Sequence, residues 1–196
     1  MEGIDDSKVG AWLEANVPGF EAPYQYELIT GGHSNLTFAC IDNSGRRVVL
    51  RRPPLGHVLE SAHDMGREHK IISALESSSV PVPKTYGLCS DPEVNGASFY
   101  VMDFIHGVVL NDSTFSVAIQ EIDRTALGEH VINILCDLHA VDIDAVGIGD
   151  LGRKEAYLAR QLNRWSKQWV ASKTHEIPAM EACQTLLSER MPDQIG

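Results

Sequence analysis

The stretch ITGGHSNLTF, residues 29–38, places residues that can bind an anion directly before an expected β-strand. Gly31 and Gly32 allow backbone N–H groups to approach a phosphate without a Cβ in the way, and Ser34 and Asn35 add hydrogen-bond donors. A hairpin turn in which glycine supplies a positive φ explains the same residues. The loop alone therefore leaves a phosphate-binding turn and a plain hairpin open.

The next two segments supply a cation and a carboxylate. RRVVLRRPP alternates around Val49 and places Arg51 near the end of a strand, and GREHKII places Glu68 in the helix expected after it. A strand cation paired with a helix carboxylate is the arrangement that fixes positive charge over nucleotide phosphates. Two unrelated surface charges are the alternative for residues considered one at a time.

A third segment, SFYVMDFIHG, has an apolar strand over residues 98–102 that runs into Asp103, Phe104 and Ile105. A strand that leaves a sheet between two lobes exposes backbone N–H and C=O groups without a ladder partner. Such groups can bind the edge of an adenine ring. The segment is therefore expected to join the two halves of the chain.

Composition limits the classes of function. The 196 residues carry a net charge of −11, which disfavours binding to a nucleic-acid backbone. The four cysteines lie far apart without a Cys-x-x-Cys spacing and the eight histidines form no ligand pattern, so we expect reduced thiols and no metal site. There is no signal-like start and no apolar run of about 20 residues, so a cytoplasmic protein without membrane contact is expected.

The hydrophobic periods predict a β-rich half followed by a helical half. The first 20 residues and residues 61–77 show helical spacing, and alternation predicts strands at 24–30, 35–41, 46–52, 84–90 and 97–103. After residue 110 the pattern is helical, at 116–140, 153–173 and 178–190. This order predicts an α+β fold with two lobes, 1–104 and 105–196, and a ligand cleft between them.

In this order, the segments ITGGHSNLTF, VVLRRPP, GREHKII, VPVPKTYG, YVMDFIHG, LCDLHAVD and GDLGRKEAYLARQLNRW resemble the aminoglycoside phosphotransferase and choline kinase-like family. The likeness covers about residues 20–190 and is greatest to a branch fused to acyl-CoA dehydrogenases. It implies a protein kinase-like fold, with an antiparallel β-sheet N-lobe containing one helix and an incomplete helical C-lobe. It also implies an ATP-dependent phosphotransferase that acts on a hydroxyl of a small molecule.

The resemblance implies a role for each matching residue. The nucleotide loop would be formed by Gly31, Gly32, His33, Ser34 and Asn35, and the adenine hinge by Met102, Asp103, Phe104 and Ile105. Arg51 would be the phosphate-binding cation and Glu68 its helix partner. Arg51 stands where the family usually has lysine. A guanidinium is planar and has several N–H donors, whereas the lysine ammonium is compact. We therefore expect Arg51 still to pair with Glu68 but to contact the phosphate at a different position than lysine would.

The catalytic loop of this family resembles His-Gly-Asp with an asparagine five residues after the aspartate, followed by a second metal-binding aspartate. None of the seven asparagines of this sequence has an aspartate five positions earlier. HAVDID, at the end of a helix, and DFI, at the hinge, do not replace that loop. We therefore expect no catalytic residue and no metal ligand within 1–196, Mg²⁺ held only by residues beyond 196, and no turnover by this part alone.

Two alternatives stay open at this point. The chain can be the nucleotide-binding part of a kinase, with ATP or GTP and a hydroxyl acceptor as partners, or a non-catalytic nucleotide-binding or regulatory module. Trp165 and Trp169, four residues apart, can stack on a substrate or belong to a core. The apolar faces of the helices at 116–140 and 153–173 predict self-association of 1–196 if nothing else covers them.

Overall fold

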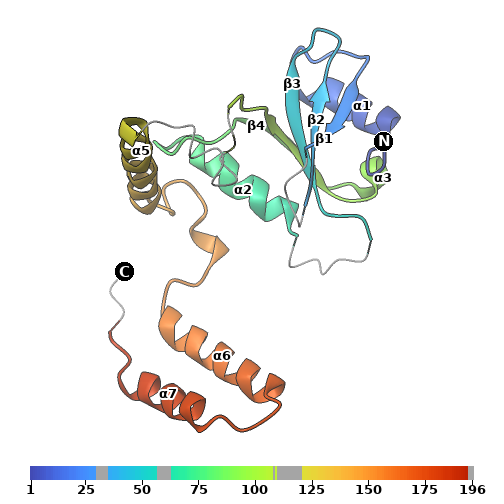
Figure 1. The fold of residues 1–196 in the computed structure, drawn as a ribbon. Coiled ribbons are helices and arrows are strands. Elements are labelled where there is room, and N and C mark those ends of the chain that lie inside the picture. Colours follow the sequence, from blue (N-terminus) through green and yellow to red (C-terminus); the bar gives the residue numbers. More distant parts are fainter. Residues whose placement is uncertain (30–34, 57–62, 108, 110–120, 194–196) are drawn as a thin grey trace. The chain divides into compact units, whose positions relative to one another are not determined.

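The structure is a computed structural model that describes residues 1–29, 35–56, 63–107, 109 and 121–193 (Figure 1). It divides into two compact units, Met1–Gly149 and Asp150–Gly196, which are described separately below. The expected loop residues Gly31, Gly32, His33 and Ser34 lie outside the described residues. Their assignment to a nucleotide loop therefore stays a prediction.

The first unit contains a five-stranded antiparallel sheet with the strand order β1-β2-β3-β5-β4 (Figure 1). Its strands are β1 (Gln25–Leu28), β2 (Leu36–Ile41), β3 (Arg47–Arg52), β4 (Thr85–Cys89) and β5 (Phe99–Asp103). Each strand lies within the range that the alternation predicts. The sheet and its helices confirm the expected α+β class.

Strand register decides which side chains share a face of this sheet. Thr37 pairs with Arg51 and Arg51 pairs with Tyr100, so these three side chains form a row across β2, β3 and β5. Residues directly opposite each other in antiparallel strands point to the same side, and neighbours along one strand point to opposite sides. The sheet therefore has a polar row on one face, whereas Leu50 and Arg52 point to the other.

The apolar face is covered by α1 (Asp6–Asn16), which the Asp5 side chain caps by accepting a hydrogen bond from the backbone N–H of Lys8. Helical spacing brings Val9 and Leu13 onto the sheet, where both are fully buried. The core also contains Val17, Phe20, Phe38, Cys40, Val48, Leu50, Phe99 and Val101. Burial of Cys40 raises the pKa of its thiol to about 12, as expected for a core thiol.

Arg52 links the segment before α1 to α3 (Pro92–Asn95) at the edge of this core. Its side chain is only 5% exposed, and its guanidinium donates to the carbonyls of Gly3, at 2.6 Å, and Asn95, at 2.9 Å. The side chain of Asn95 in turn accepts from the backbone N–H of Asp5 at 2.9 Å. The α3 segment lies between the strands expected at 84–90 and 97–103, and no helix was predicted there. It forms a short helix because the Asp91 side chain caps its start.

The opposite face of the sheet carries α2 (Met65–Leu75), which lies alongside β4 and β5. The helix begins at Met65, not at residue 61 as expected, because the Asp64 side chain caps it by accepting from the N–H of Arg67 at 2.9 Å. Glu68 consequently lies in the first turn of α2 and projects from the end of the helix that is nearest the cap.

The remaining helices are α5 (Glu121–His139), the 3₁₀ turn η2 (Gly149–Leu151), α6 (Tyr157–Ser172) and α7 (Pro178–Glu189). The three α-helices lie within the expected ranges. No helix in the described ranges is long and apolar enough to cross a membrane. The lobe boundary expected between residues 104 and 105 stays a prediction.

Candidate functional site

The carboxylate of Glu68 is the centre of a polar cluster between α2 and the sheet. Its Oε2 accepts from Arg51 Nε at 2.8 Å and from the Tyr100 hydroxyl at 3.2 Å, and its Oε1 accepts from Asn35 Nδ2 at 2.9 Å. Strands β3 and β5, the residue before β2 and helix α2 therefore contribute to one site. The expected ion pair between Arg51 and Glu68 is confirmed.

Arg51 is held at two of its nitrogen atoms. Nε donates to Glu68, and Nη1 donates to the Thr37 hydroxyl at 3.0 Å. Both side chains of the ion pair are 31% exposed, so the pair is partly shielded and still reachable from solvent. A guanidinium has five N–H donors in one plane. Within the described residues, the contacts of Nε and Nη1 fix that plane and use two of the five N–H donors.

Tyr100 forms the floor of the cluster. The residue is 1% exposed, and burial together with the nearby Glu68 charge raises the pKa of its hydroxyl. It therefore stays protonated and can only stabilise Glu68 as a hydrogen-bond donor at neutral pH. His69 packs against the Tyr100 ring, with centroids 6.0 Å apart, and burial lowers the pKa of its imidazole.

Asn35 and His63 close the cluster on the side of β2. Asn35 is 9% exposed, and its Oδ1 lies 2.5 Å from His63 Nδ1. Asn35 was expected to bind nucleotide as part of the loop, whereas its amide in this structure contacts two protein side chains. Thr37, Tyr100 and His63 were not expected at the site. The register of β2, β3 and β5 is the signal that identifies the first two, because it sets them beside Arg51.

The expected hinge residues divide between the two faces of the sheet. Met102 pairs with Val49 and lies on the same face as Arg51, two residues along from Tyr100. Asp103 lies on the opposite face, where its carboxylate accepts from the Tyr86 hydroxyl, and its backbone N–H donates to the Lys84 carbonyl at 2.8 Å. The side chain and the N–H of Asp103 are thus occupied within the sheet.

The chain leaves the sheet at the next two residues. Arg47 lies over the Phe104 ring, at 5.5 Å from its centroid, and the Ile105 side chain is 67% exposed. These residues follow β5 on the same connection that was expected to bind adenine. Their backbone groups come after the last ladder pair of β5, which is Val48 with Asp103.

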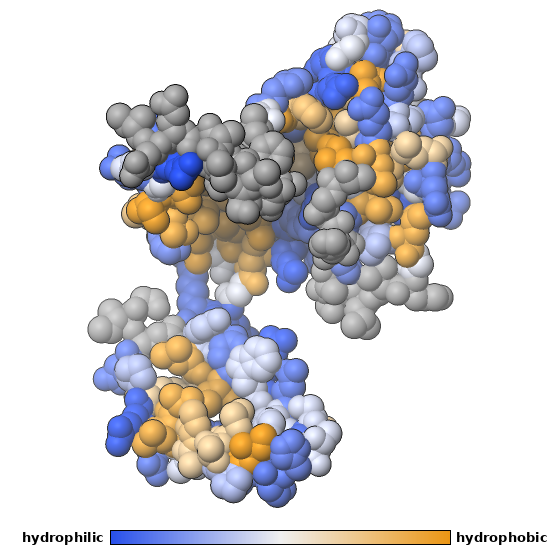
Figure 2. Space-filling view, viewed as in Figure 1, coloured by the Kyte–Doolittle hydropathy of each residue, from blue (hydrophilic) through white to orange (hydrophobic). Residues whose placement is uncertain are grey.

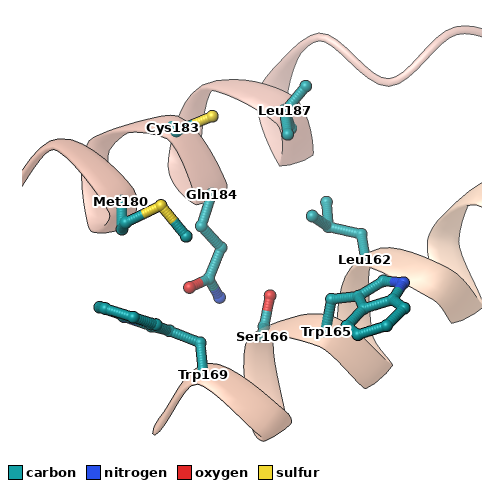
Figure 3. Close-up of a pocket in the computed structure, with 8 residues that line it drawn as sticks. All are labelled: Leu162, Trp165, Ser166, Trp169, Met180, Cys183, Gln184 and Leu187. Carbon is teal, nitrogen blue, oxygen red and sulfur yellow. The ribbon is translucent and has the colours of Figure 1, made fainter. Parts of the chain in front are cut away.

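The second unit contains an apolar groove between α6 and α7 (Figure 3). Trp165 and Trp169 both line it from α6, and Met180 and Leu187 line it from α7. Figure 2 shows apolar residues at the surface of this unit, where Trp165 is 57% and Leu187 54% exposed. Both tryptophans therefore line an apolar groove between the two helices. The expected self-association through such surfaces stays a prediction.

Comparison with known proteins identifies the family of this chain. The model of the phosphotransferase enzyme family matches residues 25–195. The chain is 34% identical over 195 residues to acyl-CoA dehydrogenase family member 11 of Rattus norvegicus, covering 97% of this chain and 25% of that protein. It is 36% identical over 163 residues to family member 10 of Mus musculus, covering 83% of this chain and 15% of that protein.

A solved structure of a Ralstonia eutropha protein assigned as an aminoglycoside phosphotransferase superposes with a TM-score of 0.81 at 35% identity. The alignment covers 97% of this chain and 54% of the other chain. The chain thus spans about half of that structure and a quarter or less of the two dehydrogenase relatives. The chain belongs to the phosphotransferase enzyme family, and its antiparallel sheet and helices have the kinase-like fold of an aminoglycoside phosphotransferase.

Proposed function

We propose that this chain is the nucleotide-binding part of an ATP-dependent phosphotransferase that acts on a hydroxyl of a small molecule. The observation that carries the proposal is the orientation of Arg51. Glu68 and Thr37 hold its Nε and Nη1, and both N–H groups of Nη2 together with the second N–H of Nη1 are the candidate donors to a phosphate. The family match supports the reaction class.

ATP fits the residues that are present. The partly exposed Arg51 supplies positive charge on the same sheet face as Met102, and the chain leaves the sheet beyond Asp103. In the proposed complex Arg51 binds the phosphates, Met102 lines the base site, and the backbone of Phe104 and Ile105 binds the base edge. The Asp103 side chain supports the hinge from the other face. The nucleotide supplies the phosphoryl group for transfer.

The metal ion expected in such a reaction is Mg²⁺. No group of three or more His, Cys, Asp or Glu side chains lies close enough together among the described residues to hold a metal ion. The proposal therefore assigns Mg²⁺ no ligand here and derives no step through it. GTP is the alternative nucleotide, since a backbone hinge can bind either purine.

The 196-residue chain is expected to bind ATP and to transfer no phosphate. Calorimetric titration with ATP, GTP and inorganic tripolyphosphate tests binding, and radiolabelled ATP with a panel of small alcohols tests transfer. A hinge that binds the base should make ATP bind at least about tenfold more tightly than tripolyphosphate, the matched ligand without a base.

Equal binding of ATP and tripolyphosphate would contradict the base site. Transfer that a point substitution within 1–196 abolishes would contradict the absence of catalytic residues, which rests on the missing Asp and Asn spacing. The second candidate is a non-catalytic nucleotide-binding or regulatory module. Transfer by a longer chain that contains the family's catalytic loop would decide for the kinase.

A further inference from the structure

We propose that Asn35 is a positioning residue for the Arg51–Glu68 pair, and that His63 fixes the Asn35 amide. Asn35 precedes the first residue of β2, and Glu68 lies in the first turn of α2. Their hydrogen bond therefore joins the sheet to the helix beside the cation. The consequence for ATP rests on the proposed function, whereas the positioning itself concerns the protein without ligand.

The chemistry of the partners fixes the orientation of the amide. Glu68 Oε1 can only accept a hydrogen bond, so the Asn35 atom that faces it at 2.9 Å is the donor Nδ2. The carbonyl Oδ1 then faces His63 Nδ1, and because this oxygen also only accepts, the proton lies on Nδ1. In the hydrogen-bonded series that runs from His63 through Asn35 to Glu68, each group is thus either the donor or the acceptor at each contact.

This chain of contacts sets the plane of the Glu68 carboxylate. With Oε1 held by Asn35 and Oε2 held by Arg51 and Tyr100, both oxygens are fixed. Loss of the Asn35 amide frees Oε1, and the carboxylate can then rotate about its last side-chain bond. The Arg51 Nε–H is consequently no longer aligned with one fixed acceptor oxygen, although both charges of the ion pair remain.

Two substitutions distinguish a positioning role of the Asn35 amide from a role of the side-chain volume alone. Asn35→Ala removes the donor, and Asn35→Asp keeps the shape but sets a second carboxylate against Glu68. The titratable and charged groups around this point are His63, Arg51, Tyr100 and Glu68 itself. The control is Asn43→Ala, which removes the same amide from an exposed asparagine beyond the end of β2.

The first readout is the ¹⁵N-NMR signal of the Arg51 Nε–H in the protein without nucleotide, assigned by its disappearance in Arg51→Lys. We expect a protected, shifted signal in the unmodified protein and in Asn43→Ala. In Asn35→Ala and Asn35→Asp it should exchange with water at least about tenfold faster. An unchanged Arg51 signal in either Asn35 variant, shown by circular dichroism to be folded, would overturn the proposal.

The second readout is ATP affinity against pH. At pH 7.5, Asn35→Asp should bind ATP about tenfold more weakly than the unmodified protein. Two adjacent carboxyls raise each other's pKa, so acidification toward about pH 5 adds one shared proton that restores a donor. The ratio of the two dissociation constants should then fall below about threefold.

A ratio that does not change with pH would mean that the aspartate variant is only structurally damaged, and would overturn the positioning role. If neither protein bound ATP, the proposed function would fail and the NMR signal would still decide the role of Asn35. Should Asn35→Ala not fold, His63→Ala removes the donor to Oδ1 and leaves the Asn35 side chain itself in place. It is expected to speed exchange of the Arg51 Nε–H, and an unchanged rate would count against the proposal.

Discussion

Replacing Arg51 with methionine is expected to weaken ATP binding about 100-fold, equivalent to about 3 kcal/mol. Methionine keeps much of the apolar stem and removes the charged donors that face the proposed phosphate position. Arg51→Lys is the charge-preserving control. It loses the Thr37 contact but keeps a cation near Glu68, so its affinity should stay within about tenfold of the original. Calorimetric titration of the variants measures both.

The stability of Arg51→Met limits the interpretation of that result. Because the Arg51 side chain is 31% exposed, its loss should leave the fold intact, and a thermal melt followed by circular dichroism verifies this. If Arg51→Met bound ATP as tightly as the unmodified protein, this would show that Arg51 does not bind the phosphates. Equal losses in the methionine and lysine variants would show that shape, not charge, is recognised.

Replacing Arg52 with alanine is expected to lower the free energy of unfolding by about 3 kcal/mol. The substitution leaves the carbonyls of Gly3 and Asn95 without their donor in a region where Arg52 is only 5% exposed. It also removes the link between the segment before α1 and α3. The Arg52 guanidinium has no carboxylate partner among its described contacts. Its stabilising effect on the fold therefore comes from the hydrogen bonds to backbone carbonyls and from the packing of its side chain.

Urea unfolding of the variants measures this effect. Arg67→Ala is the matched control, because it removes an exposed arginine from α2 and should change the free energy of unfolding by less than about 0.5 kcal/mol. A loss for Arg52→Ala no larger than that of Arg67→Ala would contradict the anchoring role. Since Arg51 and Arg52 point to opposite faces, folded Arg52→Ala should bind ATP with nearly unchanged affinity.

The strands were predictable because alternating side chains with one buried face leave a period of two in the sequence. The Arg51–Glu68 pair was predictable from the resemblance and from the placement of a cation on a strand before a helix. The short helix at Pro92 was missed, since its sequence DPEVNGA carries the same residues as a turn and only the Asp91 cap decides between them.

Contacts between residues that are far apart in the sequence could not be predicted from such a period. The pairing of Thr37 and Tyr100 with Arg51 depends on strand register, which alternation within one strand does not define. The Asn35 contact with Glu68 further depends on where α2 starts, and the Asp64 cap sets that start four residues later than helical spacing predicts. The division of Met102 and Asp103 between two faces follows from the same register.

A double-mutant cycle on ATP affinity tests most directly whether Arg51, positioned by Glu68, binds the nucleotide. The four proteins are the unmodified chain, Arg51→Met, Glu68→Gln and the double variant, each titrated with ATP by calorimetry. We expect Glu68→Gln to weaken binding about tenfold when Arg51 is present and less than about twofold in the Arg51→Met background, because Glu68 acts through Arg51. Absence of saturable ATP binding to the unmodified chain, or an equal effect of Glu68→Gln in both backgrounds, would contradict the account.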